Sequence, residues 1–144
     1  MKNALTGNGS LSLKSNPREV EELLDWLDQL LESSALDEMS AFNFRCAVVE
    51  VVNNCIQHAY QNVPDQPIEI TYDLRPDQLH VAVSDRGPVF LEFIGSELSG
   101  LSDESGRGFE IIAAWVSELH HERTDGWNVC HLVQKIHSPR LSEN

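Results

Sequence analysis

Hydrophobic residues recur along this chain with two periods, one typical of helices and the other of strands. Across residues 20–31 they follow the three-and-four spacing of an amphipathic helix. Asn16 and Glu19 have the spacing of a capping box ahead of that helix, and Pro17 suits its first position. A second segment, residues 37–60, combines helical spacing with a largely apolar side and predicts a longer helix.

Alternation of apolar and polar residues predicts the strands. The segments with this pattern are residues 11–15, 68–74, 79–85, 118–124 and 127–136. Residues 75–78 join two of these segments as a turn, which predicts a hairpin. Asp125 and Gly126 join the last two, and Asp-Gly is a strong signal for a tight hairpin turn.

The order of the elements indicates the fold class. Helices that come together in the sequence, followed by antiparallel hairpins, predict an α+β two-layer sandwich. We expect a mixed, mostly antiparallel sheet covered on one face by helices. Residues 86–107 have no steady period, and such a long loop within a compact domain is often functional. Residues 108–117 then predict a further helix, and we expect residues 1–144 to form a single domain.

Composition narrows the classes of partner. The net charge is −13, from 23 acidic and 10 basic residues, which disfavours binding to nucleic acids or anionic membranes. The three cysteines match no metal or redox spacing and are expected to be reduced core residues. The amino-terminal segment lacks the apolar core of a signal peptide, and no apolar run is long enough to span a bilayer. We therefore expect a cytoplasmic protein.

The second predicted helix carries a row of polar side chains. Glu50, Asn54 and His58 recur at intervals of four, which places them on one face over about 12 Å. An Asn carboxamide oxygen suits a divalent cation bound to a nucleotide. A carboxylate one turn away can accept a proton from an attacking hydroxyl. Taken alone, a solvated helix face is the more common explanation of such a row.

Two glycine-containing segments could complete a nucleotide site. Asp85 ends a strand and can accept a hydrogen bond from an exocyclic amine, and Gly87 would let a ring approach the backbone. Residues 106–109 open a predicted helix, where backbone N–H groups can bind phosphate. They form neither a P-loop nor a dinucleotide-binding fingerprint. Each segment alone is most simply an ordinary turn.

In combination, these features resemble the GHKL ATPase superfamily, which includes histidine-kinase catalytic domains, gyrase-type ATPases and bacterial anti-sigma-factor serine kinases. The polar row, followed by Ala59 and Tyr60, resembles the N box. Asp85-x-Gly87 resembles the first glycine box, and Gly106-x-Gly108-Phe109 resembles the second. Residues 88–105 correspond to the ATP lid, and the resemblance covers residues 11–136. It implies the histidine-kinase-like ATPase fold.

The stand-alone anti-sigma kinase branch of the superfamily is the most similar. A histidine kinase would carry a phosphoacceptor helix pair ahead of this domain, whereas about 15 residues precede the first predicted helix here. The resemblance implies an ATP- and Mg²⁺-dependent serine/threonine-protein kinase that is also an anti-sigma factor. It would phosphorylate an anti-anti-sigma partner with a STAS domain in a partner-switching pathway, bind a sigma factor and form a homodimer.

The same resemblance assigns roles to individual residues. Glu50 would act on the acceptor hydroxyl, Asn54 would hold Mg²⁺, and His58 would lie near the phosphates. Asp85 and Gly87 would receive the adenine. The residues expected around the phosphates at the second glycine box are Gly106, Arg107, Gly108 and Phe109.

The chain departs from the pattern of the superfamily in two places. Pro88-Val89 follow Gly87 where a further glycine is usual, and Glu104-Ser105 stand where some relatives carry a basic residue. These departures leave two alternatives open. One is an anti-sigma binding module with a vestigial nucleotide site, and the other is a partner-switch kinase that controls a non-sigma target such as a secretion regulator.

Overall fold

The computed structural model describes residues 6–88 and 112–137. The predicted second glycine box and nearly all of the predicted lid lie outside these residues. In chain order the elements are β1 (Gly7–Lys14), a 3₁₀ turn (Pro17–Glu19), α1 (Val20–Glu32), α2 (Glu38–Asn54), a π-helical turn (Cys55–Ala59), β2 (Pro67–Arg75), β3 (Gln78–Asp85), β4 (Glu118–Thr124) and β5 (Trp127–Lys135). Residues 112–115 are also helical.

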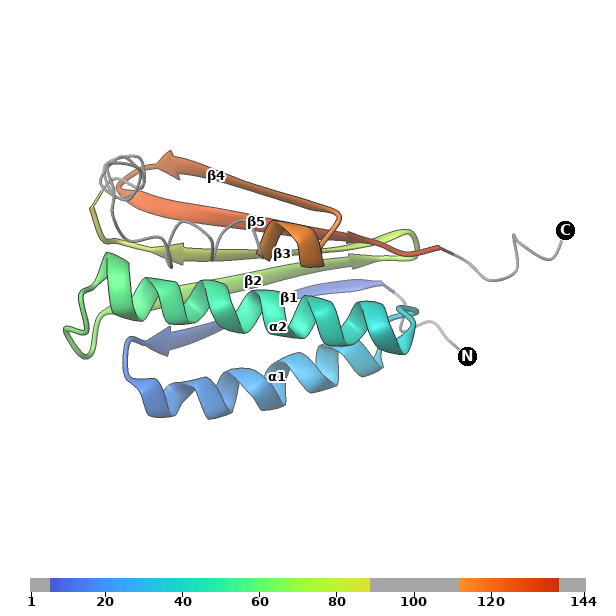
Figure 1. The fold of residues 1–144 in the computed structure, drawn as a ribbon, viewed down its shortest axis with the longest axis horizontal. Helices are drawn as coiled ribbons and strands as arrows, with labels where there is room; N and C mark the ends of the chain where they lie inside the picture. Colours follow the sequence, from blue (N-terminus) through green and yellow to red (C-terminus); the bar gives the residue numbers. More distant parts are fainter. Residues whose placement is uncertain (1–5, 89–111, 138–144) are drawn as a thin grey trace, which may run out of the picture.

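The described strands form one five-stranded sheet in the order β1-β2-β3-β5-β4. The four pairings between them are all antiparallel. Helices α1 and α2 lie side by side against one face of this sheet (Figure 1). The predicted α+β sandwich with helices on one face is therefore confirmed, and its described pairings contain no parallel pair.

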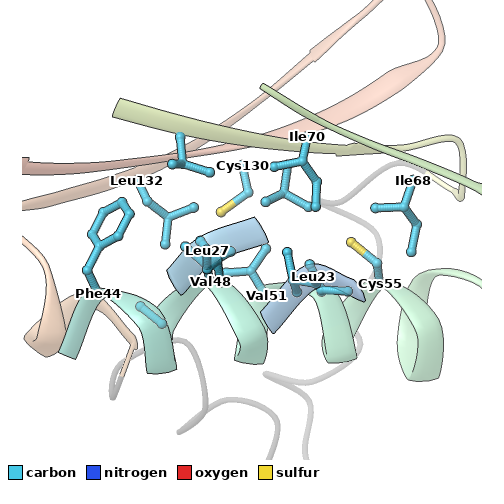
Figure 2. Close-up of a cluster of buried hydrophobic side chains, with 14 of the residues drawn as sticks. Leu23, Leu27, Phe44, Val48, Val51, Cys55, Ile68, Ile70, Cys130 and Leu132 are labelled. Atoms are coloured by element: carbon cyan, nitrogen blue, oxygen red, sulfur yellow. The ribbon is translucent and has the colours of Figure 1, made fainter. Parts of the chain in front are cut away.

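The core lies between the two helices and the inner face of the sheet. Side chains alternate across a strand, so the inner face receives every second residue, such as Ile68 and Ile70 of β2. Figure 2 shows these side chains meeting Leu23 and Leu27 of α1 and Val48 of α2, all of which are fully buried. Burial of this apolar layer fixes the positions of α2 and β3 relative to each other.

The first strand and the first helix begin differently from the prediction. Strand β1 extends four residues toward the amino terminus because it pairs with β2 from Gly7 to Lys14. Asn16 takes the predicted N-cap position and Pro17 follows it as predicted, but the Asn16 side chain makes no capping hydrogen bond. Its Oδ1 instead accepts from the Asp65 backbone N–H at 3.1 Å, which ties the helix start to the loop before β2. That long-range contact outcompetes the local capping geometry.

The turn between β4 and β5 has the predicted geometry. Asp125 and Gly126 both have positive φ, at 50° and 84°. Two successive positive φ values define the type I′ turn, whose twist matches that of the flanking strands. This tight turn sets the register in which Asn128 lies opposite Arg123 and, on the other side, opposite Asp85.

Histidines occur on both faces of the β3–β5–β4 edge of the sheet. His80, His131 and His120 share the outer face, where the His80 Nε2 and His131 Nδ1 atoms lie 2.9 Å apart. The His131 Nε2 atom lies 2.6 Å from the Glu122 carboxylate. His121 faces inward, and burial, with smaller contributions from the neighbouring His120 and His131, lowers its pKa to about 4.

The depressed pKa of His121 predicts acid sensitivity. An unfolded histidine has a pKa of about 6.5, so the unfolded chain takes up a proton at higher pH than the fold does. The stability contributed by neutral His121 is then fully present above about pH 6.5, and about 3 kcal/mol of it is lost as the pH drops to 4. Between pH 7 and 4, urea unfolding should show that the free energy of unfolding falls less for His121→Leu than for the wild type. His137→Leu, at an exposed position, is the matched control. If the wild type and His121→Leu lose the same free energy of unfolding between pH 7 and 4, this assignment is contradicted.

Candidate functional site

Helix α2 carries the predicted polar row on its outer side. Asp37 caps the helix, since its Oδ1 accepts from the Ser40 N–H at 2.7 Å. Glu50 is exposed, and Asn54 is half-buried one turn later. The intervening Val51 and Val52 are buried in the core, which confirms the predicted apolar side. The core therefore holds the row in place while Glu50 remains accessible from outside.

The helix does not continue as a regular α-helix to Tyr60. Cys55–Ala59 form a π-helical turn, directly after Asn54. A π turn holds more residues than an α turn, so the exact four-residue spacing of the predicted row ends at Asn54. His58 lies within this wider turn and is half-buried. Such turns are often found at functional sites, because they reposition side chains without ending the helix.

Asp85, at the end of β3, is one of the few buried polar residues among those described, with 7% of its surface exposed. Its Oδ1 accepts from the Gly87 backbone N–H at 2.8 Å and from the Asn128 side chain at 3.0 Å. Its Oδ2 accepts from the Cys55 thiol at 3.3 Å. The bond from Cys55 joins the end of β3 to the helix, because Cys55 directly follows Asn54.

Gly87 makes the second contact between this turn and the helix. A Cβ at this position would lie 2.7 Å from the Ala59 carbonyl oxygen and 2.8 Å from the Ala59 Cβ. Such distances are shorter than any ordinary contact, so only glycine fits here. The sequence suggested that Gly87 leaves room for a ligand ring. The structure shows that the absence of a side chain at Gly87 lets the turn after β3 pack against the π-helical turn at Ala59, and the ligand role stays a prediction.

Tyr60 is a third link between the two segments. Its hydroxyl donates to the Pro67 carbonyl oxygen at 2.6 Å and accepts from the Arg86 backbone N–H at 2.6 Å. Burial is the main cause that raises the pKa of Tyr60 to about 12, so the phenol keeps the proton that it donates. The Tyr60 ring therefore connects the end of the helix, the start of β2 and the turn after β3.

Two thiols lie beside the Asp85 carboxylate. Burial raises the pKa of Cys55 well above its usual value, and the negative charge of Asp85 adds to this effect. The same causes raise the pKa of Cys130 to about 12. Both thiols are therefore protonated at neutral pH and unreactive as nucleophiles, as expected for core residues. Protonation also means that Cys55 has a hydrogen to donate to Asp85.

An open cavity of about 420 Å³ lies where these segments meet. It is lined by Ala59, Tyr60, Val63, Gln66, Arg86, Gly87 and Pro88. The Arg86 guanidinium lies over the Trp127 ring at 4.9 Å from its centre, which fixes one edge of the opening. Asp85 is not among the lining residues, but its carboxylate binds the backbone N–H of Gly87, which is one of them.

Arg123 and Asn128 belong to this site, although sequence reasoning missed them. Asn128 contacts Asp85, Gly87 and Pro88, and Arg123 contacts both Asn128 and Gly87. The available signal was an inward-facing polar residue at the start of β5, where the alternate positions Cys130 and Leu132 are apolar. Inward polar residues need hydrogen-bond partners, and here the partner is the turn after β3.

The donor set at the helix suits Mg²⁺ that arrives with phosphates. No group of three or more His, Cys, Asp or Glu side chains within residues 6–88 and 112–137 could hold a metal ion alone. Mg²⁺ commonly takes one or two protein oxygens and completes its shell with substrate phosphates and water. The half-buried Asn54 carboxamide provides an oxygen of this kind, so this residue fits the predicted ion.

The sequence matches the model of a known family. The chain belongs to the family described as the histidine kinase-like ATPase domain, whose model matches residues 13–133. This match confirms the predicted GHKL membership.

A curated relative is the serine/threonine-protein kinase BtrW of Bordetella bronchiseptica, which is 24% identical over 136 residues, covering 90% of this chain and 93% of BtrW. This relative supports the predicted kinase branch. The crystal structure of the RsbU and RsbW domains of Rv1364c from Mycobacterium tuberculosis has the same fold, with a TM-score of 0.68 and 20% identity. That alignment covers 93% of this chain and 34% of the longer one.

In the part of the chain that the structure describes, no helix is both long and apolar enough to cross a membrane.

Proposed function

We propose that this chain is an ATP- and Mg²⁺-dependent serine/threonine-protein kinase and anti-sigma factor. Its substrate would be an anti-anti-sigma partner with a STAS domain, and phosphorylation of that partner would govern access to a sigma factor. One observation carries the proposal. The helix with Glu50 and Asn54 is locked onto the Asp85-x-Gly87 turn by the Cys55–Asp85 hydrogen bond and the Gly87–Ala59 contact. Two motifs expected at one nucleotide site thus form a single unit.

Each residue has a chemical task in this proposal. Asp85 accepts from the adenine amino group, and Asn54 holds Mg²⁺, which when bound neutralises charge on the phosphates. Glu50 accepts the proton of the substrate hydroxyl while the oxygen of that hydroxyl forms a bond to the γ-phosphorus. The bond from that phosphorus to the bridging oxygen breaks, and ADP leaves. The exposure of Glu50 suits this task, because the acceptor hydroxyl must come from another protein.

The site residues outside the described ranges keep their predicted roles as part of the proposal. Gly106 and Gly108 would present backbone N–H groups to the phosphates, Arg107 would add positive charge, and Phe109 would complete the second glycine box. His58 would lie near the phosphate end of the row. We also propose a homodimer, as the superfamily resemblance implies, and a cytoplasmic location.

A second candidate is an anti-sigma module whose nucleotide site is vestigial. Its support is that the two oxygens of Asp85 already accept three hydrogen bonds from described residues. A carboxylate used only as a structural brace would look the same. The Pro88-Val89 departure from the usual glycine box points in the same direction. A kinase acting on a non-sigma target, such as a secretion regulator, would share the chemistry of the first candidate.

The test is phosphoryl transfer to a protein. The wild-type chain is incubated with Mg²⁺, γ-labelled ATP and a STAS-domain protein from the same organism. The proposal predicts one labelled serine or threonine on the partner, located by mass spectrometry. Tight binding of the partner without any transfer would reject the kinase and favour the binding module. The acidic surface also predicts that partner affinity falls as salt rises.

A further inference from the structure

The turn that follows β3 is held by the β4–β5 hairpin. Asn128, which is buried, lies opposite Asp85 in the β3–β5 register. Its Nδ2 donates to Asp85 Oδ1 at 3.0 Å, to the Gly87 carbonyl at 3.2 Å and to the Pro88 carbonyl at 2.7 Å. A single side-chain amide therefore sets the position of the carboxylate and of the two residues that follow the strand.

Arg123 fixes which way the Asn128 amide points. It lies opposite Asn128 on β4, and its Nη1 donates to Asn128 Oδ1 at 2.9 Å and to the Gly87 carbonyl at 3.2 Å. A guanidinium can only donate, so the amide must turn its oxygen toward Arg123 and its NH₂ group toward Asp85. Without this donor the amide could rotate and present an acceptor to the carboxylate, which would repel it.

The hydrogen bonds to Asp85 leave one of its oxygens less occupied. Oδ1 accepts from both Gly87 and Asn128, whereas Oδ2 accepts only the weak Cys55 S–H bond among the described residues. An ionised carboxylate has about four acceptor positions, so the remaining one belongs to Oδ2. The orientation of Asp85 thus selects Oδ2 as the oxygen that can meet a ligand donor.

We propose that Arg123 and Asn128 are positioning residues that turn Asp85 Oδ2 toward the exocyclic amine of a purine, and so set the preference for ATP over a 6-oxo purine nucleotide. This inference rests on the proposed nucleotide function. Neither residue needs to touch the nucleotide, since both act through the carboxylate. Their effect should therefore appear in the discrimination between bases and not in the contribution of the phosphates to binding.

The experiment compares the affinities of full-length variants for ATP and for inosine triphosphate, which carries an oxygen in place of the amino group. For the wild type we expect ATP to bind about tenfold or more tightly than inosine triphosphate. Arg123→Ala should weaken ATP binding by about tenfold and leave inosine triphosphate within about twofold, so that the preference collapses. Arg123→Lys, which retains a donor, should recover part of the preference.

Arg75→Ala is the matched control, because Arg75 pairs with Asp73 beside the β2–β3 turn and should not alter the preference. If ATP binds the wild type and Arg123→Ala weakens both nucleotides equally or neither, the positioning inference is wrong while the proposed function stands. If the wild type binds neither nucleotide, the proposed function fails and this inference fails with it. Thermal unfolding of each variant checks that the fold persists.

Discussion

Replacing Gly87 with alanine is expected to weaken ATP binding by about tenfold or more and to destabilise the fold. The added Cβ would lie 2.7 Å from the Ala59 carbonyl oxygen, and backbone atoms cannot move aside as the end of a flexible side chain can. Relief requires that the turn and the π-helical end of the N box separate. That separation would also stretch the hydrogen bond from the Cys55 thiol to Asp85, which is 3.3 Å long in the structure.

The size of the effect follows from overpacking. Inserting a methyl group into a closed contact costs about 1–3 kcal/mol of folding free energy. We expect chemical denaturation of Gly87→Ala to show a loss in that range, and calorimetry to show ATP affinity reduced by about tenfold or more. Gly7→Ala is the control, since its Cβ would meet only the Tyr72 hydroxyl at an ordinary 3.8 Å. A Gly87→Ala protein with wild-type stability and ATP affinity would show that this contact has no role.

Much of the fold could be predicted from the sequence because local patterns and packing agree. The stripe on α1, the start of α2 near Asp37 and the Asp125-Gly126 turn each depend on a few neighbouring residues. The length of β1 and the role of Asn16 could not be predicted in this way. Both depend on β2 and the loop before it, which are about 50 residues away in the sequence.

In the site too, features set by neighbouring residues could be predicted, whereas features set by contacts between distant segments could not. Glu50, Asn54 and Asp85 could be proposed because their spacing and their places at element ends are visible in the sequence. The π-helical turn could not, since a run such as Cys55–Ala59 continues an α-helical pattern. Arg123 and Asn128 were missed because their importance lies in pairing across strands with a turn far away in the chain. Polar residues that point inward deserve a search for such partners.

Replacing Glu50 with glutamine is the second large effect that we expect. Glutamine keeps the shape and the hydrogen-bonding reach of glutamate but cannot accept the proton of the attacking hydroxyl. A general base contributes about 100-fold to 10,000-fold to a reaction rate, so transfer should fall by a factor in that range. Glu50 is exposed, and substitutions at such positions usually change stability by less than about 0.5 kcal/mol. Binding of ATP should be preserved, because the adenine and phosphate contacts are assigned to other residues.

We propose that Glu50 and Asn54 of α2 carry out phosphoryl transfer. The most direct test of this proposal is to measure ATP affinity and single-turnover transfer to the partner in Glu50→Gln, with Glu32→Gln at an exposed position of α1 as the matched control. We predict ATP affinity within about twofold of the wild type, and transfer reduced by at least about 100-fold in Glu50→Gln alone. Transfer at the wild-type rate in Glu50→Gln would contradict the assignment of Glu50 to the chemistry.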